Sequence, residues 1–264
     1  MRKMHTIAIG IAAALATLFA SARDAASGEG EGALSRLVRA YPGMLCGVEE
    51  NAALWCDGAR MPFDDGRPKS FDEKLDAADL EDQMSIAYPP QAPPRKDEDP
   101  GRIRSAAFFE KMYGAARAEV SKNLEVVAWL PGLSNAKVSM TRVNGVAKKL
   151  AEISREISRL DRAIAAKVRR PGGGFAWRDI AGTKRPSPHA FGIAIDVAVG
   201  RSHYWRWDKA RLGELGRRFD DIPEAVVRIF ERRGFIWGGR WYHYDTMHFE
   251  YRPELAMERE YSCP

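Results

Sequence analysis

Two short segments of the sequence hold residues suited to binding and using a metal ion. The first, residues 187–196, contains His189 and Asp196, and the second, residues 245–250, contains His248. Two histidines and one aspartate form a ligand set that suits a catalytic zinc ion with an open fourth position for water. A further carboxylate that stands near the metal without binding it could take the proton from that water.

Strand periodicity gives these residues a common face. Alternate residues of an extended segment point to the same side. Gly192, Ala194 and Asp196 would then share one side of a strand, and His248 and Glu250 would share the polar side of another. The glycine and alanine leave their side nearly bare beside a carboxylate, which indicates a bound species that lies close against the sheet.

The elements that must position these residues predict an α+β protein, because helices and strands follow one another without regular βαβ alternation. Apolar residues recur at steps of three and four from Val146 to Val168, which is typical of one long amphipathic helix. Asn144 is placed to cap that helix. We also predict helices over 71–80, 103–113 and 221–233, and strands over 126–130, 138–143, 175–180, 192–199, 235–237 and 247–251.

The first 22 residues have the pattern of a secretory signal. Arg2 and Lys3 precede an apolar run, and Ala20-Ser21-Ala22 supplies a small-x-small cleavage site. The run is shorter than the about 20 apolar residues that a membrane-spanning helix needs, which disfavours the alternative of an uncleaved anchor. We therefore expect cleavage after Ala22, a periplasmic or secreted protein, and no stable membrane insertion after cleavage.

Composition excludes whole classes of protein. The 264 residues include 41 Lys and Arg, 36 Asp and Glu, and 45% hydrophobic residues. These values exclude a mainly disordered, collagen-like or polytopic membrane protein. The net charge of +5 gives no argument for a nucleic-acid partner. The basic face of the helix predicted over 146–168 is the one feature that favours such a partner, and export argues against it.

Export also changes what the three cysteines imply, because thiols tend to pair outside the cytosol. Cys46 and Cys56 flank a short segment with turn-prone residues at its centre, and we expect them to close a small hairpin. Cys263 would be left over, and the other pairings remain open.

Residues 88–100 contain five prolines and predict an extended linker. We therefore divide the chain into a signal peptide over 1–22, an N-terminal arm and linker over 23–100, and a C-terminal domain over 101–264.

The motifs resemble those of a known family. Ser-x-His-x-x-Gly-x-Ala-x-Asp at 187–196, followed by Asp-x-x-His-Phe-Glu at 245–250, is similar to the VanY-like zinc peptidases of bacterial cell walls. The resemblance extends over about 172–253 and leaves residues 23–99 unexplained. It implies a hedgehog/D,D-peptidase fold, an antiparallel sheet with flanking helices preceded here by an irregular N-terminal arm.

The resemblance assigns roles residue by residue. His189, Asp196 and His248 would bind zinc, and Asp245 would stand at the general-base position, where many relatives have glutamate. Arg178 matches a substrate-clamping arginine, which could hold the substrate carboxylate or the developing oxyanion.

Other residues would support these groups. Ser187 would touch the substrate or support His189, and Glu250 would be either a hydrogen-bond partner of a ligand histidine or a plain surface carboxylate. Aromatic residues that could line a substrate pocket are Trp177, His203, Tyr204, Trp205, Trp207, Trp241 and Tyr242.

The implied function is hydrolysis of an amide bond in peptidoglycan stem peptides, of the D-alanyl-D-alanine carboxypeptidase type. L-alanyl-D-glutamate endopeptidase activity is the alternative within the family, and its members often use aspartate as the base. A non-catalytic zinc-containing module that binds the cell wall is a third possibility. The presence of both Asp245 and Arg178 argues against it, since a pure binder needs neither.

Overall fold

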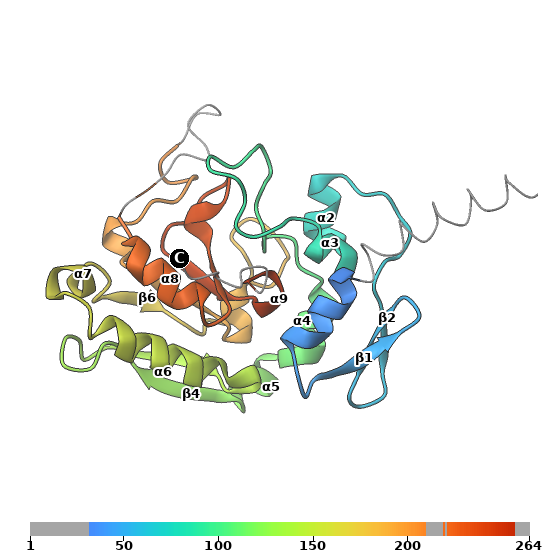
Figure 1. The fold of residues 1–264 in the computed structure, drawn as a ribbon, viewed down its shortest axis with the longest axis horizontal. Helices are drawn as coiled ribbons and strands as arrows, with labels where there is room; N and C mark the ends of the chain where they lie inside the picture. The colour runs from blue at the N-terminus through green and yellow to red at the C-terminus, as the bar shows by residue number, and fades with distance from the viewer. Residues whose placement is uncertain (1–31, 210–218, 220, 257–264) are drawn as a thin grey trace, which may run out of the picture.

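The computed structural model describes residues 32–209, 219 and 221–256 (Figure 1). The predicted signal segment, its cleavage site after Ala22, and Cys263 lie outside the described residues. The described chain combines helices with antiparallel sheets, so the α+β prediction is confirmed. No helix within the described ranges is long and apolar enough to cross a membrane.

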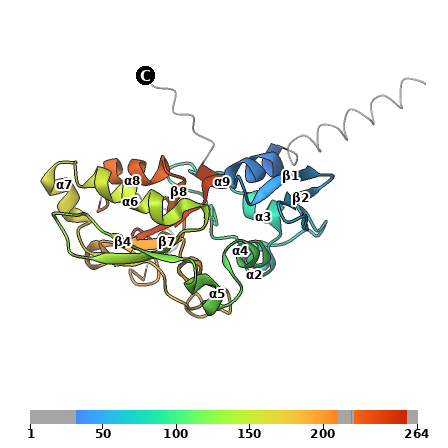
Figure 2. The same cartoon turned by 90° about the horizontal axis from the view of Figure 1, so that it is seen from below.

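A four-stranded antiparallel sheet forms the centre of the C-terminal part. In spatial order its strands are β6 (Pro171–Gly173), β7 (Ala194–Val197), β9 (His248–Tyr251) and β8 (Phe235–Trp237). Helices α6 (Val146–Ile157) and α8 (Glu224–Glu231) lie together on one side of the strands (Figure 2). The sheet therefore has one face covered by helices and one face available to a site.

The pairing of β7 with β9 sets which side chains share a face. Asp196 lies directly opposite His248, and Ile195 lies opposite Phe249. Because side chains alternate along a strand, the two polar residues point away from the helices while the apolar pair points into the core. The ring of Phe249 stacks on Phe230 of α8, with ring centroids 4.0 Å apart. This register brings two of the predicted metal ligands together.

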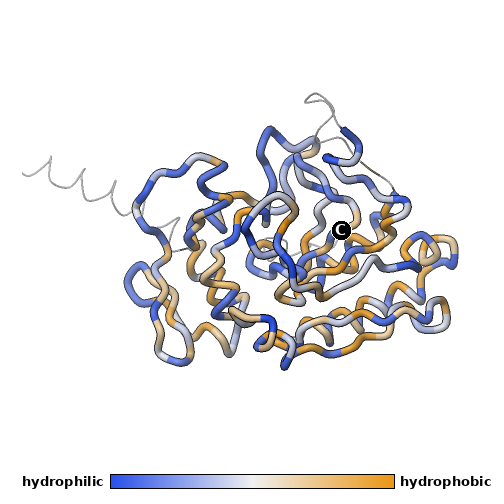
Figure 3. The backbone as a smooth tube through the Cα atoms, turned by 180° about the vertical axis from the view of Figure 1, so that it is seen from behind, coloured by the Kyte–Doolittle hydropathy of each residue, from blue (hydrophilic) through white to orange (hydrophobic). Residues whose placement is uncertain are grey.

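A hairpin and the amphipathic helix form a second layer. The hairpin consists of β4 (Leu124–Ala128) and β5 (Lys137–Thr141), and α6 packs against it. In Figure 3 apolar stretches of chain concentrate in these layers, and the outer loops are mostly hydrophilic. Two short helices, α5 (Arg117–Ser121) and α9 (Pro253–Ala256), complete this part of the chain.

The prediction of one helix from 146 to 168 is wrong, because the chain breaks it after Ile157. A second helix, α7 (Arg162–Lys167), starts where the Asp161 side chain accepts a hydrogen bond from the Ala163 amide at 2.8 Å. A local cap therefore overrides the continuous apolar stripe. Asn144 does not cap α6 either, since it has φ +54° in a 3₁₀ turn and its Nδ2 donates to Tyr113.

The N-terminal part is ordered, so the prediction of an irregular arm is wrong for most of it. Residues 32–40 are helical, and a three-stranded sheet follows. Tyr41 and Trp55 both pack on Phe108 with ring centroids 5.5 Å away, which joins this part to the rest of the core. Its elements are β1 (Leu45–Glu49), β2 (Ala52–Trp55), β3 (Arg60–Pro62), α2 (Phe71–Ala77) and α3 (Leu80–Met84), and Phe108 belongs to α4 (Ala106–Tyr113).

Two strand predictions near the site also fail. Residues 175–180 form no strand, and only Asp179 makes an isolated bridge, to Pro186. Gly192 does not belong to β7, because it ends a 3₁₀ turn with φ +68°. An added Cβ there would lie 3.0 Å from the Thr141 amide nitrogen, so both backbone angle and space require glycine. The face beside Ala194 is not bare either, because Glu250 stands opposite it.

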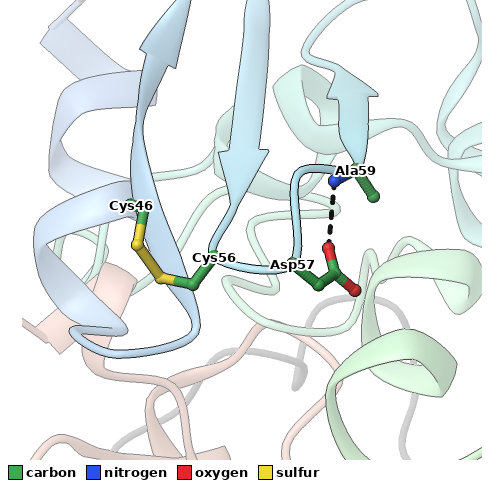
Figure 4. The surroundings of a disulfide bond; sticks show 4 residues. All are labelled: Cys46, Cys56, Asp57 and Ala59. Atoms are coloured by element: carbon green, nitrogen blue, oxygen red, sulfur yellow. Dashed lines mark hydrogen bonds between the residues drawn. A yellow bond between two sulfur atoms is a disulfide. The ribbon is translucent and has the colours of Figure 1, made fainter.

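The N-terminal sheet contains a disulfide between Cys46 and Cys56, which close the β1–β2 hairpin at its base (Figure 4). The adjoining turn is fixed by the Asp57 side chain, which accepts a hydrogen bond from the Ala59 amide at 3.0 Å. The two cysteines are separated by 10 positions.

Replacing Cys46 and Cys56 together by serine is expected to lower the free energy of unfolding by about 2–3 kcal/mol, because the closed loop no longer restricts the unfolded chain. Urea unfolding followed by tryptophan fluorescence measures this difference. Reducing agent should destabilise the unmodified protein by a similar amount and leave the double variant unchanged. Equal stability of the two oxidised proteins would contradict the assignment of a stabilising role.

Candidate metal centre

Three side chains converge at one end of the central sheet. Asp196 extends from β7 and His248 from β9, while His189 comes from the 3₁₀ turn Pro188–Phe191 that precedes β7. Asp196 Oδ1 lies 3.2 Å from His189 Nε2 and 3.1 Å from His248 Nδ1. Both histidines are buried, and one ligand atom from each of the three residues lies within 4.8 Å of the others. The structure therefore brings together the predicted ligand set.

The outward ring nitrogens of both histidines are held by the protein. His189 Nδ1 lies 2.6 Å from the Gly174 carbonyl oxygen, and His248 Nε2 lies 3.3 Å from Glu250 Oε2. A histidine that binds a metal usually donates its other N–H to a carbonyl or carboxylate, which fixes the tautomer and the ring plane. The arrangement leaves His189 Nε2 and His248 Nδ1 facing Asp196.

Glu250 is fully buried and is itself held by two arginines. Arg104 contacts it through Nε at 2.8 Å and Nη2 at 2.5 Å, and Arg252 Nη1 lies 3.3 Å away. Burial alone would raise the pKa of Glu250, but these positive charges hold it well below its usual range. Of the two roles predicted for Glu250, the structure supports that of a partner to His248 rather than a surface carboxylate.

The same ion network reaches the N-terminal part of the chain. Arg252 Nε donates to Glu254 at 2.6 Å, and Glu254 accepts a hydrogen bond from the Tyr41 hydroxyl at 2.6 Å. Gln83 Nε2 also contacts Glu254, at 3.3 Å. The orientation of the site is thus linked to residues far upstream of it.

Glu250→Gln is expected to weaken zinc binding about 10- to 100-fold, because the amide cannot anchor the His248 ring as a carboxylate does. Competition with a fluorescent zinc chelator measures the affinity of the full-length protein. Glu224→Gln, on the solvent side of α8, is the matched control and should bind zinc as the unmodified protein does. Unchanged affinity in Glu250→Gln would show that Glu250 does not orient the ligand.

The charges of the cluster stabilise one another. Burial would raise the pKa of Asp196, yet hydrogen bonds from His189 and His248 hold it far below its ordinary value. Burial would lower the pKa of His248, but hydrogen bonds to Asp196 and Glu250 raise it to about 10. The site therefore favours an ionised Asp196 beside positive charge, which a bound cation would also supply.

Asp245 stands beside the cluster without joining it. Its Oδ1 is buried and has no hydrogen-bond partner among the described residues. Burial raises the pKa of Asp245 to about 6, with His248 and Asp196 acting on it in opposite directions. A buried carboxylate oxygen without a partner is rare in folded proteins. Its place three residues before His248 suits a group that receives a proton from a water molecule in the site.

These features fit a zinc ion, because the donor set consists of two imidazoles and a carboxylate. The ring nitrogen of each histidine that faces away from Asp196 is already hydrogen-bonded, and Asp245 Oδ1 has no hydrogen-bond partner among the described residues. The acidic groups formed by Asp64, Asp65 and Asp79, and by Asp79, Glu81 and Asp82, do not fit a metal as well. The Lys69 ammonium lies within 3.0 Å of Asp65, Asp79 and Asp82 and already supplies their positive charge.

A cleft of about 260 Å³ opens onto the three residues. Arg178 lines it, with an exposed side chain whose Nη1 lies 3.4 Å from the Asp179 carbonyl oxygen. Ser187 is buried, and its Oγ accepts a hydrogen bond from the His189 amide at 3.4 Å. The structure thus puts Arg178 where a ligand in the cleft would reach it, and it joins Ser187 to the backbone of His189.

The aromatic lining was predicted only in part. Tyr204, Trp207 and Trp241 border the cleft. The remaining aromatic candidates, which lie away from the lining, are Trp177, His203, Trp205 and Tyr242.

Sequence reasoning missed two arginines of the cleft. Arg102 and Arg104 border the cleft from a segment assigned partly to a helix, but α4 begins only at Ala106. The sequence offered one signal for this pair: the two arginines flank the buried Ile103. Alternate residues of an extended segment share a face, so Arg102 and Arg104 would lie on the same side, opposite Ile103.

Comparison with known proteins gives one finding. Residues 181–251 match a family model described as D-alanyl-D-alanine carboxypeptidase. No curated protein and no solved structure matches the chain significantly. The matched residues include the three candidate ligands, Asp245 and Ser187, whereas Arg178 lies just before them. Over about a quarter of its length, the part that holds the candidate metal centre, the chain is similar to D-alanyl-D-alanine carboxypeptidases.

Proposed function

We propose that this protein is a zinc-dependent peptidase that removes the terminal D-alanine from peptidoglycan stem peptides. The observation that carries the proposal is the convergence of His189, Asp196 and His248 beside the unpartnered carboxylate oxygen of Asp245. The similarity of residues 181–251 to D-alanyl-D-alanine carboxypeptidases supports the substrate class. The hedgehog/D,D-peptidase fold is part of the same proposal, as is a peptidase domain over 101–264.

The residues of the chain divide the chemistry. A zinc ion held by the three ligands would lower the pKa of a water molecule towards ~7 and polarise the scissile carbonyl. Asp245 would accept a proton from water and later deliver it to the leaving amine. Arg178, exposed in the cleft, would donate charge-assisted hydrogen bonds to the oxygen on which negative charge develops.

Carboxypeptidase and endopeptidase activity differ in whether the peptide ends in the cleft or passes through it. The description of the matched family favours the carboxypeptidase. The aspartate at the base position favours the L-alanyl-D-glutamate endopeptidase, which remains the alternative. A cell-wall-binding module without activity would leave the unpartnered carboxylate of Asp245 unexplained.

We also propose that the protein acts in the periplasm or is secreted. The disulfide between Cys46 and Cys56 supports an oxidising compartment. The peptide substrate would be met there as well.

Incubation of the full-length protein with purified muropeptides, with and without a chelator, tests the proposed function. Mass spectrometry should detect loss of a single alanine, and the chelator should abolish the reaction. Separation of L-alanine from D-glutamate would establish the endopeptidase alternative instead. Absence of any chelator-sensitive cleavage would contradict both activities.

A further inference from the structure

The guanidinium of Arg102 borders the cleft and has few partners. Its Nη1 lies 3.5 Å from the His243 carbonyl oxygen and 3.6 Å from Asp99 Oδ2. Both separations exceed the 2.7–3.2 Å typical of N–H···O hydrogen bonds. Within the described residues, Nε and Nη2 of Arg102 donate no hydrogen bond, although the side chain is only 18% exposed.

The carboxylate that pairs with Arg102, that of Asp99, is already engaged elsewhere. Asp99 is fully buried, its Oδ1 accepts a hydrogen bond from the His243 amide at 2.8 Å, and its Oδ2 lies 2.6 Å from His243 Nδ1. The His243 ring packs edge-on against Trp205, with centroids 4.8 Å apart. Asp99 therefore fixes His243 firmly and leaves Arg102 only a weaker, longer contact.

Neighbouring arginines differ from Arg102 in this respect. Arg104 contacts the Glu250 carboxylate through two nitrogens, at 2.8 and 2.5 Å. Arg178 is exposed to solvent and needs no partner. Arg102 thus combines a mostly buried position with a long contact to a carboxylate that His243 already binds.

A mostly buried cation is costly to the fold when its counter-ion is shared with another group. Burial lowers the pKa of Arg102, and the charges of Arg104 and Arg206 act in the same direction against the attraction of Asp99. An anion that enters the cleft would remove this cost. A carboxylate suits the free edge of the guanidinium best, because its two oxygens match two parallel N–H donors.

We propose that Arg102 binds the C-terminal carboxylate of the peptide substrate, in a subsite that Asp99 and His243 hold in place. The proposal rests on the proposed function and deepens it, since a pocket that ends in a carboxylate-binding arginine selects a free peptide terminus. It also assigns a role to Asp99 and Arg102, which lie before the segment that matches the family model. Arg178 is then left for the oxyanion rather than for the terminus.

Binding of a ligand that cannot be hydrolysed tests this subsite independently of activity. The ligand is an N-acyl-D-alanyl-D-alanine analogue in which a methylene-amine replaces the scissile amide, made as the C-terminal acid and as the C-terminal amide. Calorimetry with the zinc-loaded, full-length protein gives both dissociation constants. We expect the acid to bind about 10- to 100-fold more tightly, which is the range for a hydrogen bond between charged groups.

Arg102→Gln should bring the ratio of the two dissociation constants close to one while zinc content stays the same. Arg95→Gln is the matched control, since its side chain is 73% exposed in the preceding segment, and it should keep the full ratio. If Arg102→Gln fails to fold, Arg102→Lys decides, because it keeps the charge but loses the planar fork and should show an intermediate ratio.

Three results would overturn the subsite: equal binding of acid and amide by the unmodified protein, no binding of the acid, or an unchanged ratio in the Arg102 variant that folds. None of these depends on hydrolysis. A protein that prefers the acid yet cleaves no muropeptide would keep the subsite and refute the proposed function. A protein that cleaves muropeptides but binds the acid and the amide equally would support the proposed function and refute the subsite.

Discussion

Asp245→Asn is expected to reduce kcat for muropeptide hydrolysis by about 10²- to 10⁴-fold, the usual contribution of a general base or acid. Asparagine keeps the size of the side chain but cannot accept a proton. Zinc binding should persist, because Asp245 is not among the three residues whose ligand atoms converge. The measurement is steady-state kinetics together with the zinc content of the purified variant.

Two comparisons make the Asp245 result specific. Asp179→Asn, on an exposed residue near the cleft, should retain full activity and full zinc content. The loss in Asp245→Asn should appear in kcat rather than in KM, because the proton transfer contributes to the transition state and little to ground-state binding. Near-normal turnover in Asp245→Asn would remove this residue from the role of base.

His248→Ala is expected to abolish both zinc binding and hydrolysis. The substitution removes a ligand atom and leaves Asp196 with one imidazole partner instead of two. The loss of zinc affinity should exceed the about 10- to 100-fold expected for Glu250→Gln, since that change alters only the support of the ligand. Metal analysis after dialysis against a zinc buffer measures the difference.

His203→Ala is the control for the loss of a histidine. His203 lies outside the cleft lining and hydrogen-bonds Asp208 through Nδ1 at 2.9 Å, so zinc content and hydrolysis should both survive its replacement. Retention of stoichiometric zinc in His248→Ala would place the metal elsewhere in the protein.

The residues of the candidate metal centre could be anticipated because they lie in two short segments with strong local patterns. Alternation along each strand was enough to put His248 and Glu250 on one face. The register that sets Asp196 opposite His248 could not be read from either segment, because it depends on pairing across 52 positions of sequence.

Other parts of the site could not be predicted because they depend on distant contacts. Arg102 reaches the cleft, and Asp99 reaches His243, because the proline-rich segment packs across the molecule. Tyr88 in that segment hydrogen-bonds Glu231 at 2.6 Å and accepts a hydrogen bond from the Trp237 amide at 3.0 Å. Nothing in the composition of this segment distinguishes such a buried path from a free linker.

Local chemistry also overrode periodicity in two places. The apolar stripe from Val146 onward predicted one helix, yet the Asp161 cap begins a new one. Gly192 was assigned to a strand, where its small size indicated space for a ligand. Its positive φ shows that it is needed to turn the chain between His189 and Asp196. A single glycine thereby helps to bring two candidate ligands together.

The most direct test of the account is to remove the metal from the full-length protein and add zinc back in steps. Release of D-alanine from muropeptides is measured at each step for the unmodified protein and for His248→Ala. We expect activity to be absent without zinc, to rise in proportion to added zinc, and to level off at one zinc ion per chain, with no recovery in the variant. Hydrolysis that is independent of zinc, or that returns equally in His248→Ala, would contradict a catalytic metal centre at His189, Asp196 and His248.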